Sequence, residues 1–236
     1  MRGGPLTRAD RLMTEALAQV PADTPPRLRQ RFLNTHARIK LALGKLDDSV
    51  RLYHEATRLA DRQGPDWRRA EQRTALAYAF YVAKQVERAS EVSQEVIDLA
   101  RRAPDNLALS EALNVKGMVL GTQGRAAEEL QAMKASIEHA RLAGVRYTEV
   151  LGLANLADYY LVQGDNARAL AVALDALPLA RAIKDPSAES VALVNAGLAS
   201  IGLGRSAEGV NMVRESLMLL ARSSPAAAVS CAVKHL

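Results

Sequence analysis

The chain has 236 residues, of which 49% are hydrophobic but only 4% are Phe, Trp or Tyr. This aliphatic composition favours helices and excludes an all-β fold, because alanine, leucine, arginine and glutamate suit helices whereas sheets need β-branched and aromatic residues. No stretch approaches the roughly 20 apolar residues of a membrane span, and Met1 to Pro5 do not lead into a secretory signal. The lone Cys231 cannot form an internal disulfide. We therefore predict a cytoplasmic protein with no membrane partner.

The net charge of +5 comes entirely from the first half of the chain. Residues up to Gly117 include 20 basic and 15 acidic side chains, whereas the remainder has 11 of each. The basic residues are densest between Arg27 and Arg73, where acidic residues are interleaved with them. Such interleaving is typical of the solvated face of a helix, so the charge pattern does not favour nucleic acid as the partner.

Glycine recurs with a period of 40 residues along the whole chain. The glycines are Gly4, Gly44, Gly124, Gly164 and Gly204, and Lys84 occupies the missing position. Small residues at fixed places around these glycines predict a close approach of helix axes. Seven positions before these turn positions the small residues are Ala37, Ala77, Gly117, Ala157 and Gly197. Five positions after the turn they are Ala9, Ser49, Ala89, Ala169 and Gly209, with Glu129 as the exception. Twelve positions after the turn they are Ala16, Ala56, Ser136, Ala176 and Ser216, with the larger Val96 as the exception.

The segments between these glycines have the periodicity of amphipathic helices. Between positions 151 and 164, apolar residues from Leu153 to Leu161 recur at helical spacing. Gly164 is expected to end this helix in the left-handed conformation, and Asp165 is a favourable start for the next one. Each repeat is thus predicted to be a helix, a tight glycine turn and a second helix.

This arrangement resembles the tetratricopeptide repeat (TPR). The resemblance is carried by Leu153-x-x-Leu156-Ala157-x-x-Tyr160, by Gly164-Asp165, and by Ala169 and Ala176. The period of 40 exceeds the usual 34 of that family and is similar to the long repeats of maltose-activator-like (MalT-like) bacterial regulators. The resemblance implies an all-α fold, a right-handed α-solenoid of about 12 helices without strands, and a non-catalytic role in binding other proteins.

We expect one TPR-like solenoid domain over residues 1–236. Five repeats are predicted at 25–64, 65–104, 105–144, 145–184 and 185–224. An unpaired second helix is predicted at 5–24, and an unpaired first helix at 225–236. Because the chain opens and closes within a repeat, we expect a fragment truncated at residue 236, and capping helices are the alternative.

No pattern of catalytic, metal-binding or cofactor-binding residues is evident in the sequence. The four histidines are scattered over different repeats, and none has a ligand spacing to Cys231. Glycines such as Gly121 and Gly124 are expected to end helices and do not follow strands, so they do not predict a phosphate-binding loop. We therefore predict that the chain is not an enzyme and that it has no catalytic residue, no metal and no cofactor.

If the repeats have the geometry of the family, the first helices line a concave groove, and positions 40 residues apart form rows along it. Polar and aromatic members of these rows gather in the first three repeats. We expect the asparagines to hydrogen-bond a peptide backbone, the tyrosines to pack against it and the arginines to attract acidic groups. The predicted partner-binding residues are Arg31, Asn34, Arg38, Thr74, Tyr78, Tyr81, Asn114 and Met118. For Asn155 and Asn195, bonds to neighbouring backbone are the favoured interpretation.

The same rows become aliphatic in the fourth and fifth repeats. One row, for example, runs through Arg31, Glu71, Glu111, Leu151 and Val191. Exposed aliphatic rows are typical of surfaces that another element covers. We expect this part of the groove to form a homodimer or to dock an output domain, unless the aliphatic residues are core.

Three functions fit these observations. The first is a scaffold that binds a protein or peptide partner in bacterial signalling or regulation. The second is the sensory TPR region of a larger signalling protein, such as a diguanylate cyclase or a transcription regulator, with any output activity beyond residue 236. The third is a helical repeat that binds RNA or DNA, which the charge pattern does not favour.

Overall fold

The computed structural model describes residues 4–21, 23–63, 65–102 and 104–223, and within these ranges it contains eleven α-helices and no strand. The all-α prediction is therefore confirmed for the described residues. The final helix predicted at 225–236 lies outside them. The helices are α1 (Pro5–Gln19), α2 (Pro26–Ala42), α3 (Leu46–Gln63), α4 (Asp66–Val82), α5 (Val86–Arg102), α6 (Asn106–Thr122), α7 (Ala126–Ala143), α8 (Arg146–Val162), α9 (Asn166–Ile183), α10 (Pro186–Gly202) and α11 (Ser206–Ser223).

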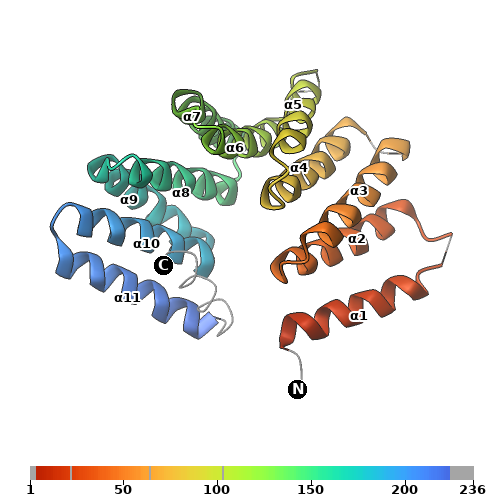
Figure 1. Cartoon of the computed structure of the whole chain (residues 1–236), viewed down its shortest axis with the longest axis horizontal. Helices are drawn as coiled ribbons and strands as arrows, with labels where there is room; N and C mark the ends of the chain where they lie inside the picture. Colours follow the sequence, from red (N-terminus) through yellow and green to blue (C-terminus); the bar gives the residue numbers. More distant parts are fainter. Residues whose placement is uncertain (1–3, 22, 64, 103, 224–236) are drawn as a thin grey trace. The chain divides into compact units, whose positions relative to one another are not determined.

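The chain divides into two compact units, Met1–Glu129 and Leu130–Leu236. In the first unit each helix from α1 to α6 packs against the next, and α4 also packs against α6 (Figure 1). In the second unit α8 to α11 are linked in the same way, and α8 also packs against α10. Helical hairpins that contact their neighbours in chain order make an α-solenoid, so the predicted solenoid of TPR-like helix pairs is confirmed. The single domain over residues 1–236 stays a prediction.

The turns inside the hairpins have the backbone conformation that the glycine period predicts. Gly44, Gly124, Gly164 and Gly204 have φ between 71° and 81°. Lys84, which replaces the glycine in the second repeat, has φ of 61°. At Gly124 the turn is closed by hydrogen bonds from the Gly124 amide to the Gly121 carbonyl and from Arg125 to Leu120, each 3.0 Å long. These are the bonds of a left-handed helix C-cap.

A second series of left-handed turns joins one repeat to the next. Gly144 has φ of 69°, and Lys184, 40 residues later, has φ of 55°. The helix that follows Lys184 is capped by Asp185, whose carboxylate accepts hydrogen bonds from the amides of Ser187 and Ala188. The repeat therefore has two positions at which the backbone adopts the left-handed conformation. At each of them one repeat has a lysine instead of glycine, which raises the free energy of that conformation.

The predicted small residues are the contact points between the two helices of a hairpin. In the first repeat the Ser49 hydroxyl, five positions after the turn, donates to the Ala37 carbonyl, seven positions before it, over 2.9 Å. In the last hairpin a Cβ added to Gly209 would collide with the carbonyl oxygen of Gly197. The backbones of the paired helices therefore approach closely at these two positions, as the sequence predicts.

Glu129, the exception among the small residues, is accommodated by a glycine on the partner helix. A Cβ added to Gly121 would collide with the Glu129 carboxylate. The positions equivalent to Gly121 in other repeats hold Leu41, Tyr81, Leu161 and Ile201. A large residue on one helix and a glycine on the other thus preserve the close packing of the pair.

A buried cluster of charged side chains attaches α1 to α2. Asp10 accepts hydrogen bonds from His36, at 2.8 Å, and from Lys40 and Lys45, at 3.2 and 2.7 Å. The Lys45 and Lys40 ammonium groups hold the pKa of the Asp10 carboxyl well below its usual range. Asp10 and His36 occupy repeat positions that hold apolar residues in most other repeats. For Asp10 these are Val50, Leu130, Leu170 and Val210, and for His36 they are Leu76, Leu156 and Ala196, whereas Ser90 and Lys116 are the polar exceptions.

The cluster can be tested by replacing it with the apolar pair of most other repeats. Asp10→Leu alone should cost about 3 kcal/mol of stability, because His36 loses its hydrogen-bond partner and Lys40 loses a buried counter-charge. Adding His36→Leu should recover a large part of that loss, since Lys40 keeps Asp48 at 3.4 Å. Chemical denaturation followed by far-UV circular dichroism measures both values. A double variant no more stable than the Asp10→Leu variant would contradict this account.

The left-handed lysine in the second repeat provides a second test. Lys84→Gly should raise stability by about 0.5 to 1 kcal/mol, because glycine adopts a positive φ without the steric cost that lysine bears. Gln85→Gly, at the adjacent position with an ordinary φ, should lower it. Thermal unfolding of both variants checks the sign, and a loss of stability in Lys84→Gly would show that the turn is not strained.

Candidate functional site

The predicted partner-binding residues all lie on the first helices of the first unit. Arg31, Asn34 and Arg38 are on α2, Thr74, Tyr78 and Tyr81 are on α4, and Asn114 and Met118 are on α6. We call these eight residues, together with Glu71 on α4 and Glu111 on α6, the first-helix face.

On α2 the face presents two exposed arginines and a partly buried amide. Arg31 and Arg38 are exposed. Asn34 lies between them, and its Oδ1 atom is buried without a hydrogen-bond partner among the described residues. Because this oxygen is buried, a bound peptide reaches it only if the Asn34 side chain turns outward.

On α4 the three predicted residues differ in their availability. Tyr78 is 40% exposed, whereas Tyr81 is partly buried against the hydrophobic core of the first unit. Thr74 is buried, and its hydroxyl donates to the Ala70 carbonyl of its own helix at 3.0 Å. Thr74 and Tyr81 therefore contribute to packing, and Tyr78 is the side chain of the three that is open to solvent.

Tyr53, on α3, connects the exposed groups of α2 and α4. Burial raises the pKa of Tyr53, the Arg38 guanidinium opposes this rise, and Tyr78 adds to it. Both side chains must lie near the Tyr53 hydroxyl to act on it electrostatically. The structure thus places Arg38 and Tyr78 around one buried residue, as their adjacent repeat positions predict.

On α6 the two predicted residues are less open than those on α2. Asn114 is partly buried, and Met118 packs against the hydrophobic core of the first unit. Of the eight predicted residues, Arg31, Arg38 and Tyr78 are exposed, and Tyr78 is 40% exposed.

Glu71 and Glu111 belong to this face, although the sequence analysis did not select them as site residues. They lie 40 residues apart on α4 and α6, which pack against each other. Burial, followed by repulsion from Glu71 and then from Asp105, raises the pKa of Glu111 to about 7. Their shared row with Arg31 was visible in the sequence, but the partial burial of Glu111 and the repulsion between the two carboxylates depend on tertiary packing.

The charged groups of the first-helix face make no ion pair with a described residue. This holds for Arg31, Arg38, Glu71 and Glu111. Elsewhere in the same unit, by contrast, Arg73 bonds both Asp61 and Glu95. Charges that the fold leaves uncompensated remain available to a partner.

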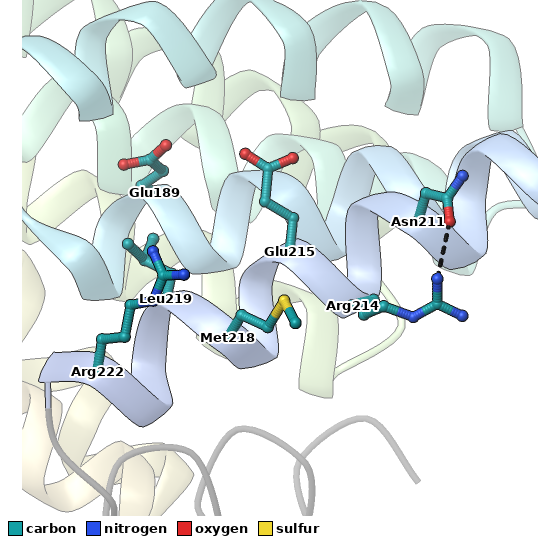
Figure 2. A pocket seen from close by; sticks show the side chains of 7 residues that line it. All are labelled: Glu189, Asn211, Arg214, Glu215, Met218, Leu219 and Arg222. Atoms are coloured by element: carbon teal, nitrogen blue, oxygen red, sulfur yellow. Dashed lines mark hydrogen bonds between the residues drawn. The ribbon is translucent and has the colours of Figure 1, made fainter.

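A separate cavity of about 290 Å³ lies on α10 and α11 (Figure 2). Glu189 and Glu215 line it, and both are already bonded to Arg181, at 2.8 and 3.2 Å. The same bond recurs one repeat earlier between Arg141 and Glu149 at 2.7 Å. Figure 2 also shows Arg214 bonded to Asn211. The carboxylates of this cavity therefore belong to the repeat packing.

The aliphatic rows of the second unit differ in burial from one row to the next. Ala154 and Val194 are buried, and the Asn195 amide donates to the Ala154 carbonyl at 2.9 Å. This bond confirms the interpretation of Asn195 as a bridge to neighbouring backbone. Leu151 and Ile201 remain exposed, at 38% and 39%. Docking of a second copy or of an output domain through these rows stays a prediction.

The described residues also bear on two other classes of function. They contain no group of three or more His, Cys, Asp or Glu side chains placed to hold a metal ion. None of the helices in the described ranges is both long and apolar enough to cross a membrane.

Comparisons with known proteins show likeness in structure. No protein-family model matches the chain, and no curated protein matches it. The chain is similar to a Rap protein in complex with Competence and Sporulation Factor, with a TM-score of 0.75, 13% identity, and coverage of 88% of this chain and 58% of that one. It is similar to NprR in complex with its cognate peptide NprX, with a TM-score of 0.68, 14% identity, and coverage of 92% and 63%.

A third likeness is to the TPR-like repeats of a kinesin light chain from Podosopora anserina, with a TM-score of 0.59, 14% identity, and coverage of 86% of this chain and 99% of that one. The chain thus spans 58% and 63% of the Rap and NprR chains. At these identities the likeness shows the fold alone, and that fold is TPR-like.

The raised pKa of Glu111 makes a prediction about stability. Between pH 4.5, the ordinary carboxyl pKa, and about pH 7, Glu111 is protonated in the folded protein and ionised in the unfolded chain. The free energy of unfolding therefore falls as pH rises through this window. Glu111→Gln should therefore stabilise the protein by about 1 to 2 kcal/mol at neutral to basic pH, and by nothing below the ordinary carboxyl pKa. Denaturation across this pH range measures the difference, and a gain independent of pH would contradict it.

Proposed function

We propose that the chain is a non-catalytic scaffold that binds an extended peptide or helix of a protein partner on the first-helix face, in bacterial signalling or regulation. The observation that carries this proposal is that Tyr78 and Arg38 are both exposed on a face whose charged side chains have no ion pair among the described residues. Aromatic and arginine side chains contribute most to binding in many protein interfaces. The bound factor and peptide of the similar Rap and NprR structures support a peptide or protein ligand.

A second proposal is that the chain is the sensory repeat region of a larger signalling protein. It is supported by the 58% and 63% of the Rap and NprR chains over which this chain aligns. An in-frame continuation of the coding sequence past Leu236 into an output domain would decide for this proposal.

The binding face can be tested with a peptide selected on the immobilised protein from a random library. Arg38→Glu combined with Tyr78→Ala should weaken binding of that peptide by roughly tenfold or more, because both changes remove central contacts. Fluorescence anisotropy measures the affinity, and far-UV circular dichroism should show unchanged helicity.

The matched control is Arg58→Glu combined with Tyr147→Ala. Both of these residues are exposed and lie outside the first-helix face. The control should bind the peptide as the unaltered protein does. Equal affinity in the test and control variants would place the binding surface elsewhere.

A further inference from the structure

The unpaired charges of the first-helix face are separated by sign. The basic groups, Arg31 and Arg38, are both on α2. The acidic groups, Glu71 and Glu111, are on α4 and α6, which pack against each other. The exposed Tyr78 is also on α4 and lies near Arg38 through their shared neighbour Tyr53. One end of the face is thus basic, the other is acidic, and an aromatic side chain lies beside the basic end.

The fold itself does not require charge at these positions. In the second unit the row that contains Arg31, Glu71 and Glu111 continues with Leu151 and Val191. The helix pairs of that unit pack in the same way with apolar residues there. A partly buried carboxylate beside a like charge costs stability, so the acidic pair of the first unit has a cost that apolar residues would avoid.

A bound cation would remove this cost. No described lysine or arginine lies within ion-pair distance of Glu71 or Glu111. A cationic group placed between the two carboxylates would offset both the burial and the repulsion that raise the pKa of Glu111. The pair therefore favours a positively charged group on the partner.

We propose that the first-helix face binds an extended peptide of mixed charge, with an acidic residue against Arg31 and Arg38 and a cationic amino or guanidino group against Glu71 and Glu111. This inference rests on the proposed function and specifies the ligand of the same face. Complementary charges at both ends of the ligand fix its direction and exclude partners with a single sign of charge.

The test is a selection of peptides from a random library on three proteins. These are the unaltered protein, the Glu71→Gln and Glu111→Gln double variant, and a control with Glu87→Gln and Glu91→Gln, two exposed acids on α5. Peptides enriched on the unaltered protein and on the control should carry both an acidic and a basic residue. On the test variant the basic residue should no longer be enriched.

The affinity of a selected peptide without histidine provides the second measurement. Its binding to the test variant should be about tenfold weaker than to the control. Binding to the unaltered protein should weaken as pH falls below about 7, because Glu111 becomes protonated and loses its attraction for the cation. N-acetylation distinguishes a side-chain cation, which keeps its affinity, from the terminal amine of the peptide, which loses it.

The outcomes separate this inference from the proposed function. Enrichment of the same peptides on the test variant and on the control, with Arg38→Glu and Tyr78→Ala still weakening binding, would overturn the mixed-charge ligand and leave the binding face intact. Absence of any enriched peptide on the unaltered protein would overturn both. Circular dichroism of the test variant checks its folding, which we expect to be preserved because Leu151 and Val191 are accepted at the equivalent positions.

Discussion

The two helices of a hairpin meet where small residues face each other, and the rest of the structure depends on this contact. Ser49 donates to the carbonyl of Ala37, and Gly209 lies against the backbone of Gly197. Because the contact involves backbone, it leaves no room for a larger side chain on both helices. Where Glu129 breaks the pattern, Gly121 provides the space. This packing constraint holds the repeat to one register, and the register aligns equivalent positions of successive first helices.

A constant register also makes it clear which charged residues the packing needs. The buried Asp10 accepts hydrogen bonds from Lys45, Lys40 and His36 and attaches α1 to α2. Its negative charge is therefore compensated by groups of the same unit. The carboxylates at the α10–α11 cavity are likewise bonded by Arg181. The first-helix face differs because its charges have no such counter-charge in the part of the chain that the structure describes, and because other repeats accept aliphatic residues in the same row.

Glu111 illustrates how a binding face can oppose stability. Burial and the neighbouring Glu71 raise its pKa to about 7, which means that its charged form is disfavoured in the folded protein near neutral pH. Residues retained despite such a cost are frequently found at functional sites. The cost is also what would make a cationic ligand favourable, since the ligand removes the repulsion and replaces part of the lost solvation.

The sequence by itself determined the all-α class, the 40-residue repeat and the left-handed turns, because steric requirements of the backbone recur in every copy and appear as glycine and small residues in register. It also placed Arg38 and Tyr78 on neighbouring first helices. Only the tertiary structure decided which side chains of a row are available. The Thr74 hydroxyl turns back to its own helix, while Tyr78 is exposed. Likewise, the repulsion between Glu71 and Glu111 arises between helices distant in sequence, because burial and proximity depend on packing that periodicity does not specify.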